Sequence, residues 1–472
     1  MSERIEAPII LHSKKNMASF NTASIAIELI QGVLSILIFF FYEAELGLNS
    51  LLAGLGVTIY AIYDAFNDPL IGYLTDRPFR WTKKWGRRFP FIAVFFIPMI
   101  FCFLLVFSPP IFVQNSEWGL FGWLVFSTCL FDTVESFFTV NYWALGPDKF
   151  RDQGERRILS TFEVYFGFIG VILSFVVPPM IINFGNISSY AIMAWVCVGI
   201  SLGVWFLMYA GITDDKETVQ HYLVSYEQQE RESFLKSVKS VLSHKNYLAY
   251  LLLYILYQAM VQLMLASVYY HTYFILKVDP EVVTFLILAF FFGGLISLPL
   301  WIRWTNKTQD NRKTWIYSAS LMAITAAPLT FMMYLTSDLI LIGDLIVLFL
   351  YGLAFGGFWV MITPVFSDVI DESVVMTEKR RESTYGGFRQ FFLNLARVIQ
   401  ALTLAIVHTL TGFKEGAKPS AQPASALFGL QLHFGLLPAI YIGIGVLIFW
   451  KMYDITPDKV KQNKAKLIEM KL

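Results

Sequence analysis

The stretch YDAFNDPLIGYLTDR, residues 63–77, decides how the rest of the chain is interpreted. It continues an apolar run that begins at Leu51, so it predicts a membrane-spanning helix with two carboxylates, Asp64 and Asp68, inside it. Side chains four residues apart share one face of a helix, with Cβ atoms about 5–6 Å apart. An acid in the hydrocarbon region costs at least about 2.5–3.5 kcal/mol. Two acids on one face therefore require a cation, a proton or a basic partner.

The composition is that of an integral membrane protein. Of the 472 residues, 56% are hydrophobic and 15% are charged, which is less charge than soluble domains carry. The formal net charge of +1 gives no indication of a nucleic-acid partner, and we expect none. We find no phosphate-binding loop and no nucleophile–base or metal constellation, so the sequence predicts no direct ATP use, no enzyme activity and no cofactor.

The chain contains about twelve apolar runs that are long enough, at about 20 residues, to span a bilayer. They cover residues 19–42, 51–75, 89–108, 118–146, 158–184, 190–211, 247–276, 282–304, 314–336, 338–366, 383–411 and 429–452. We therefore predict an all-α membrane protein.

A polar, charged insert separates the sixth run from the seventh. Its second part alternates like an amphipathic surface helix. The apolar side of that helix comprises Phe234, Leu235, Val238, Val241 and Leu242. We predict an N-terminal six-helix bundle over 1–211, a cytoplasmic linker over 212–246, and a C-terminal six-helix bundle with a cytoplasmic tail over 247–472.

Lys and Arg gather in alternate loops, and the positive-inside rule sets the orientation. The loops at 76–88, 147–157, 305–313 and 367–382 are basic, whereas the opposite loops hold few basic residues. We therefore expect a multi-pass protein of the cell membrane with both termini in the cytoplasm.

The two halves repeat one pattern. A proline, an acid, a basic pair and a Ser-Thr pair follow the fourth run, over 147–161, and the same order follows the tenth, over 364–384. Such repeats are typical of secondary transporters. The alternative is a chance likeness between two basic loops, but the matching topological position favours a repeat.

Short motifs relate the chain to known proteins. Residues Gly72–Arg77, followed by Gly86-Arg87-Arg88, resemble the loop signature of the major facilitator superfamily. The preceding residues, with Asp64, Asp68 and Pro69, resemble the narrower glycoside–pentoside–hexuronide:cation symporter family, to which melibiose permease belongs. The sequences Tyr142-Trp143-Ala144-Leu145 and Arg380-Arg381-Glu382-Ser383 fit the same family. This resemblance covers essentially the whole chain and implies the major facilitator fold, with twelve transmembrane helices in two six-helix bundles.

The resemblance implies a cation site on Asp64 and Asp68 for H⁺ or Na⁺; if Na⁺ is the coupling ion, these two are its metal ligands. Carboxylate oxygens suit small hard cations, and clustered acids suit protons. The alternative is a buried pair neutralised by a fixed basic group. Thr139 and Asn394 occupy the positions of two further family partners, an acid and a lysine. We expect these two residues and water to complete the site.

The resemblance also implies substrate-binding positions. Glu28 matches a substrate-binding acid and Trp143 matches an aromatic that stacks on a sugar ring, although Trp143 is equally compatible with core packing. Glu163 replaces a substrate-contacting arginine. The eleventh helix offers Arg389 and Arg397 instead of the family lysine. Three roles for these arginines stay open: pairing across the halves when the transporter is empty, holding an anionic substrate, or static pairing.

Several other residues carry expectations for gating and packing. The inner gate is predicted to comprise Asp76, Arg77, Arg87, Arg88, Asp368 and Arg380, with a merely solvated basic loop as the alternative. His271 either lines the cavity or relays protons, or it is a hydrogen-bonded structural residue. Gly293, Gly294, Gly352 and Gly356 predict close packing or bending of helices.

Together these features predict cation-coupled symport of a small polar solute, a glycoside or sugar, by alternating access. The expected partners are the small-molecule substrate and membrane lipids, and we expect a monomer. One alternative is a symporter of a lysolipid or other amphiphile. Another is a non-transporting sensor built on a transporter fold.

Overall fold

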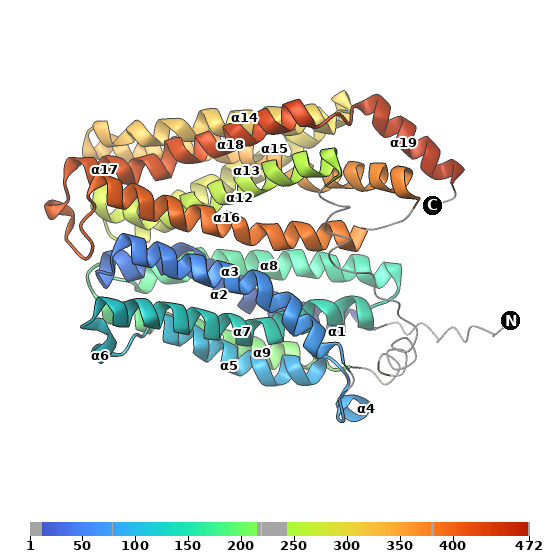
Figure 1. The fold of residues 1–472 in the computed structure, drawn as a ribbon, viewed down its shortest axis with the longest axis horizontal. Coiled ribbons are helices and arrows are strands. Elements are labelled where there is room, and N and C mark those ends of the chain that lie inside the picture. The colour runs from blue at the N-terminus through green and yellow to red at the C-terminus, as the bar shows by residue number, and fades with distance from the viewer. Residues whose placement is uncertain (1–11, 78, 215–218, 220–242, 379–381, 471–472) are drawn as a thin grey trace. The chain divides into compact units, whose positions relative to one another are not determined.

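The computed structural model describes residues 12–77, 79–214, 219, 243–378 and 382–470 (Figure 1). These residues form helices and connecting segments, and no strand occurs among them. The amphipathic helix expected around residue 238 and the predicted gate residue Arg380 lie outside the described residues.

The chain divides into two compact units, and unit 1 comprises residues 1–48 and 59–231. Its elements are α1 (Lys14–Asn21), α2 (Ala23–Phe40), the π-helical turn η1 (Phe41–Glu45), α3 (Ser50–Thr75), α4 (Thr82–Trp85), α5 (Phe89–Val106), α6 (Ile111–Gln114), α7 (Glu117–Lys149), α8 (Gln153–Ile181) and α9 (Ile187–Ile212). Within this unit α5 packs against α7 and α9, and α2 packs against α8 and α9. The start of α3 clusters with unit 2.

Unit 2 comprises residues 49–58 and 232–472. Its elements after α3 are α12 (Lys245–Tyr270), the π-helical η2 (His271–Leu276), α13 (Glu281–Thr308), α14 (Asn311–Ala326), the 3₁₀-helical η3 (Ala327–Tyr334), α15 (Ser337–Thr377), α16 (Glu382–Thr411), the 3₁₀-helical η4 (Pro419–Ala421), α17 (Ala424–Gln431), the π-helical η5 (Leu432–Leu436), α18 (Leu437–Met452) and α19 (Pro457–Glu469). Here α13 and α14 pack against α15, α12 packs against α16 and α18, and the terminal helix α19 lies on α15.

Helix starts follow from polar residues placed just before the apolar runs. Ser116 accepts from the amide of Gly119 at the start of α7, Asp152 accepts from two amides of α8, and Asp310 accepts from the amide of Lys313 in α14. Such caps satisfy the first amides of a helix, which have no partner within it.

The observed helices confirm the predicted all-α class. Among the described residues, eleven helices are long and apolar enough to cross a membrane, and α3, with Asp64 and Asp68 in it, is a further helix of 26 residues. The prediction of a loop over 367–382 is wrong for most of its length, because helix α15 continues up to Thr377. Its buried Val369 and Val374 show why, because this polar segment still buries an apolar face.

The predicted glycine packing is confirmed in unit 2. A Cβ added to Gly352 would lie 2.0 Å from the carbonyl oxygen of Phe290, and one added to Gly293 would lie 2.2 Å from that of Phe349. The backbones of α13 and α15 therefore approach more closely than any larger residue would allow.

Candidate functional site

An amide joins α3 to α7 beside the two carboxylates of the opening stretch. Asn67 Nδ2 donates to Asp132 Oδ2 at 2.9 Å and to Ser136 Oγ at 3.0 Å. All three side chains are buried. Because Asn67 lies between Asp64 and Asp68 in sequence, these bonds hold that part of α3 against the middle of α7.

Asp132 lies at the centre of an acidic cluster that also contains Asp64, Asp68 and Glu135. These three carboxylates are close enough to act electrostatically on Asp132. The charged groups that act most strongly on Asp132 are these three acids. Gln31 of α2 donates its Nε2 to Glu135 Oε1 at 2.5 Å and so connects a third helix to the cluster.

The donor set consists of carboxylate, amide and hydroxyl oxygens, which are hard ligands suited to Na⁺ or H⁺. Among the described residues, no three His, Cys, Asp or Glu side chains converge as a metal site by themselves. A cation would therefore need oxygens such as those of Asn67 and Ser136, or water, beside the carboxylates.

The two residues expected to complete the cation site lie in different surroundings. The hydroxyl of Thr139 donates to the carbonyl of Glu135 on its own helix, at 3.0 Å, so its oxygen still has lone pairs available. Asn394 belongs to α16 in unit 2.

Two of the predicted substrate residues meet in unit 1. Glu28 of α2 and Glu163 of α8 lie within electrostatic range of each other. Gly170 lets α8 approach α2 closely beside Glu28, because a Cβ added there would lie 2.8 Å from Glu28 Cβ. Trp143 on α7 is 43% exposed and touches the buried ring of Tyr142. Its exposure argues against simple core packing.

Arg389 lies in unit 2 among aromatic rings. Its guanidinium carbon is 4.9 Å from the ring centre of Phe366 and 5.5 Å from that of Tyr254. Nη1 donates to the hydroxyl of Tyr250 at 3.4 Å, whereas the buried Nε has no hydrogen-bond partner. A half-buried cation stacked on rings, with a spare donor at its buried Nε, is suited to an anionic group.

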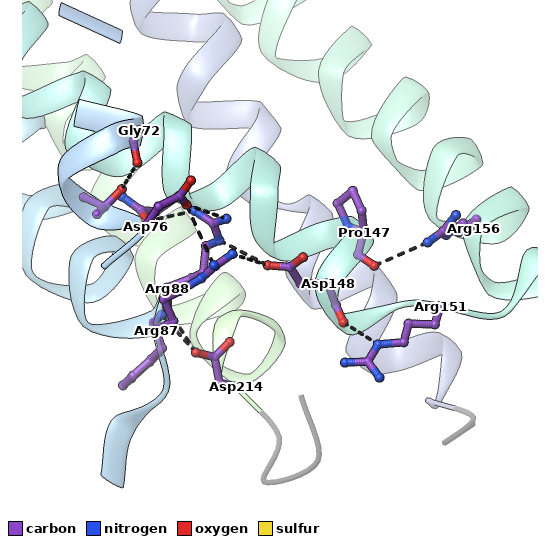
Figure 2. A network of polar contacts seen from close by, with 12 residues as sticks. Gly72, Asp76, Arg87, Arg88, Pro147, Asp148, Arg151, Arg156 and Asp214 are labelled. Carbon is purple, nitrogen blue, oxygen red and sulfur yellow. Dashed lines mark hydrogen bonds and ion pairs between the residues drawn. The ribbon is translucent and has the colours of Figure 1, made fainter. Parts of the chain in front are cut away.

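The predicted gate residues of unit 1 form the ion-pair network in Figure 2. Arg87 contacts Asp148 at 2.9 Å and Asp76 at 3.8 Å, and Arg88 contacts the same two carboxylates at 3.2 and 3.3 Å. The network ties the end of α3 and the end of α7 to the start of α5. Arg77 instead donates to the hydroxyl of Tyr73, one turn earlier, at 2.6 Å.

Asp214, just after α9, completes this network (Figure 2). Its Oδ2 accepts from the backbone amides of Arg88 and Phe89 and so caps α5, whose own N-cap residue makes no side-chain cap bond. Burial raises the pKa of Asp214, although these amides and Lys149 act in the opposite direction. Gly86 makes the contact possible, because it has φ +84° and a Cβ added there would lie 1.8 Å from Asp214 Oδ2.

Unit 2 repeats this contact with different chemistry. Asp368 near the end of α15 accepts from Asn311 Nδ2, at the start of α14, at 2.9 Å. The pair corresponds in position to Asp148 of α7 and the arginines at the start of α5. The internal repeat seen in sequence therefore has a structural counterpart, in which an amide takes the place of the two guanidinium groups.

The residues that the sequence predicts for the cation site do not include Asn67, Asp132 or Ser136. A signal was present: Asp132, Ser136 and Thr139 follow each other at spacings of four and three, which place them on one helix face. Asn67 stands beside Asp68 within the motif itself.

Comparisons with known proteins agree with this architecture. Residues 19–457 match the family model described as MFS/sugar transport protein. The chain is 23% identical to the sodium-dependent lysophosphatidylcholine symporter 1-A of Danio rerio, covering 89% of this chain and 82% of that protein. It is 22% identical to the isoprimeverose transporter of Lactiplantibacillus pentosus, covering 95% and 91%. The crystal structure of a D-xylose–proton symporter has the same fold, with a TM-score of 0.57 at 16% identity over 94% of this chain and 96% of that one.

Proposed function

The chain belongs to the MFS/sugar transport protein family, and on that premise we propose that it couples the uptake of a small polar solute, a sugar or glycoside, to a cation. The protein is an integral membrane symporter of the major facilitator superfamily, and its family and relatives are transporters, not enzymes. The identities of the solute and of the coupling ion, H⁺ or Na⁺, are the parts that we propose.

The observation that carries the proposal is the acidic cluster on α3 and α7. Asp64, Asp68 and Asp132 lie together in membrane helices with the oxygens of Asn67 and Ser136 beside them. Several carboxylates in a bilayer are costly unless a cation or proton neutralises them. A bound cation that favours the solute-binding conformation must, by linkage, bind more tightly when the solute is present.

The remaining features fit transport by alternating access. The two halves would rock around a solute held near mid-membrane. Glu28, Glu163 and Trp143 would contact the solute from the N-terminal half. We further infer that both termini and the linker at 212–246 face the cytoplasm, because the basic loops of the sequence share that side.

The test uses proteoliposomes of the full-length protein and labelled isoprimeverose. Uptake should rise when a Na⁺ or H⁺ gradient points inward, and Asp68→Asn should remove this dependence on the gradient. Tyr63→Phe is the matched control, because it removes another α3–α7 hydrogen bond, to Thr133 at 2.7 Å, without removing a charge. Uptake that ignores all cation gradients, or gradient-driven uptake that survives Asp68→Asn, would contradict the proposal.

A lysolipid is the second candidate solute, and Arg389 favours it. A guanidinium with an unpartnered, buried Nε among three aromatic side chains would suit the phosphate of a lysophospholipid. The relative from Danio rerio is named for lysophosphatidylcholine.

Competition separates the two solutes. If unlabelled lysophosphatidylcholine is itself transported with the cation, and Arg389→Gln abolishes that transport while Arg397→Gln retains it, the lysolipid is the substrate. If isoprimeverose is transported and the lysolipid is not, the sugar assignment holds. An absence of gradient-driven flux for both solutes, with intact binding, would indicate a sensor.

A further inference from the structure

Unit 2 contains a pair of ionisable side chains that the transport proposal does not use. His271 Nε2 lies 2.7 Å from Asp344 Oδ2, and both side chains have 0% of their surface exposed. His271 opens the π-helical turn η2 at the end of α12, and Asp344 lies on α15. The pair therefore joins two helices inside the C-terminal half.

The pair leaves polar atoms unsatisfied. His271 Nδ1 and Asp344 Oδ1 are both buried without a hydrogen-bond partner. Native proteins pair nearly all buried polar groups, so each unpaired one needs an explanation other than its contribution to stability. By contrast, both ring nitrogens of His244, at the opposite end of α12, have hydrogen-bond partners: Nδ1 pairs with the hydroxyl of Tyr385 and Nε2 with Glu372.

A second histidine pair lies close by. His408 Nε2 and His433 Nε2 are 3.0 Å apart, so one of the two nitrogens must carry the hydrogen between them. His433 Nδ1 is also 2.6 Å from the hydroxyl of Ser267. The ring of His271 stacks on Phe434, the residue after His433, at 4.6 Å.

These contacts define the titratable surroundings of the pair. From η2 and α12 come His271 itself and Tyr270, whose ring meets the edges of His408 and His433. From α16 comes His408 and from η5 comes His433, and both His271 and His408 act electrostatically on His433.

A hydroxyl that does not titrate packs on η5, and the base of the pair is a histidine. The segment η3, which packs on η5, contributes the hydroxyl of Thr330, which does not titrate. Within the described ranges, the basic group in ion-pair contact with Asp344 is His271.

We propose that His271 and Asp344 form a proton-binding site in the C-terminal half, separate from the acids of α3 and α7. With one proton the pair is neutral as a whole, either as imidazolium and carboxylate or as imidazole and carboxylic acid. Without that proton a carboxylate stays behind with no exposure and no cation. A lone buried charge is strongly unfavourable, so the pair holds one proton while it is closed and releases it only when water reaches it.

The π-helical turns give the site a means of opening. His271 begins η2 and His433 lies in η5, and such turns are wider than the α-helix and recur at functional sites. A shift of either turn would admit water to the unpartnered atoms of the pair. Proton binding at this site would then depend on the conformation of the transporter, and through it on the solute.

The first measurement needs no solute. Infrared difference spectra of the purified full-length protein in lipid, taken between about pH 5 and about pH 8, report carboxyl and imidazole protonation. Because the protein in lipid also samples conformations that admit water to the pair, we expect a titrating signal that disappears in both His271→Gln and Asp344→Asn. His244→Gln is the matched control, because it changes a buried histidine–carboxylate pair at the other end of α12, about 40 Å along the helix. Spectra of wild type and both variants that superimpose would overturn the proposal.

The second measurement uses transport with saturating Na⁺, which keeps the carboxylates of α3 occupied if Na⁺ is their ion. The apparent affinity for the solute should then still change with pH, and the slope of its logarithm against pH should fall by about one in the variants. Unchanged slopes with active transport would reject the proton site and leave the proposed symport intact.

A variant with both residues replaced separates a proton site from a packing role. His271→Leu combined with Asp344→Leu removes the ionisable groups but fills their volume, and apolar replacement of a buried pair is often neutral for stability. We expect this protein to fold and to lack the titrating signal. Persistence of the signal in a folded double variant would overturn the proposal.

Discussion

Asn67 offers the sharpest test of the site on α3 and α7. Its Nδ2 donates to both Asp132 and Ser136, so the substitution Asn67→Ala removes two buried hydrogen bonds and an amide oxygen that the bonds leave available as a ligand. A hydrogen bond to a charged group is worth about 1.5–3 kcal/mol, and each 1.4 kcal/mol corresponds to about ten-fold in affinity. We therefore expect the apparent Na⁺ affinity to fall by about ten- to about one hundred-fold.

The assay is solute uptake into proteoliposomes as a function of Na⁺ concentration at fixed pH. Coupling to H⁺ should respond differently, because the carboxylate of Asp132 loses a donor that competes with the proton. A variant that loses Na⁺ stimulation but keeps H⁺ stimulation thus identifies Asn67 as part of the Na⁺ site. The reasoning is refuted if Na⁺ affinity is unchanged, or if the control Tyr63→Phe lowers it equally.

Three further perturbations address stability. Gly86→Ala should lower the thermal midpoint of the purified protein. Residues other than glycine lose about 1–3 kcal/mol at the φ of +84° and ψ of 178° found there, and the new Cβ would meet Asp214. A midpoint equal to wild type would contradict this account. Gly352→Ala should also lower the midpoint, since its Cβ would press on a carbonyl of α13, whereas an unshifted midpoint would mean that the helices can separate freely. The docking of α19 should depend on pH. Burial opposes the charges of Asp454 and Lys459, but their mutual hydrogen bond lowers the pKa of the acid and raises that of the base. The resulting stabilisation is present above the ordinary pKa of the acid and below that of the base. It is lost as pH falls through the lowered pKa or rises through the raised one. The protection factors of the α19 amides, which correct for the intrinsic pH dependence of hydrogen exchange, should therefore fall at both edges. Protection factors that are flat across pH would be the contrary result.

The helices were predictable because apolar length dominates their formation. Every predicted span has a helix. The predicted end of α15 is too early, because its apolar face continues beneath polar residues such as Asp368. Span length follows from the thickness of the bilayer, which is a property of the solvent. No contact between helices has to be known for that prediction.

The site was harder to predict because it depends on the register between helices. Sequence spacing relates Asp64 to Asp68 on one helix, but it gives no information on which turn of α7 faces them. The structure selects the turn with Asp132 and Ser136 through Asn67. Similarly, Asp214 looked like one acid of a charged linker, and its role as a cap for α5 depends on where α9 ends.

The contact that both units repeat, between Asp148 and the arginines at the start of α5 and between Asp368 and Asn311, has a consequence for the response to ionic strength. In unit 1 it consists of ion pairs whose acids, Asp76 and Asp148, are 44% and 41% exposed, so dissolved salt reaches and screens them. In unit 2 the corresponding bond joins a carboxylate to the neutral amide of Asn311, which screening affects little. Added salt is thus a reagent that loosens one half of the repeat and spares the other.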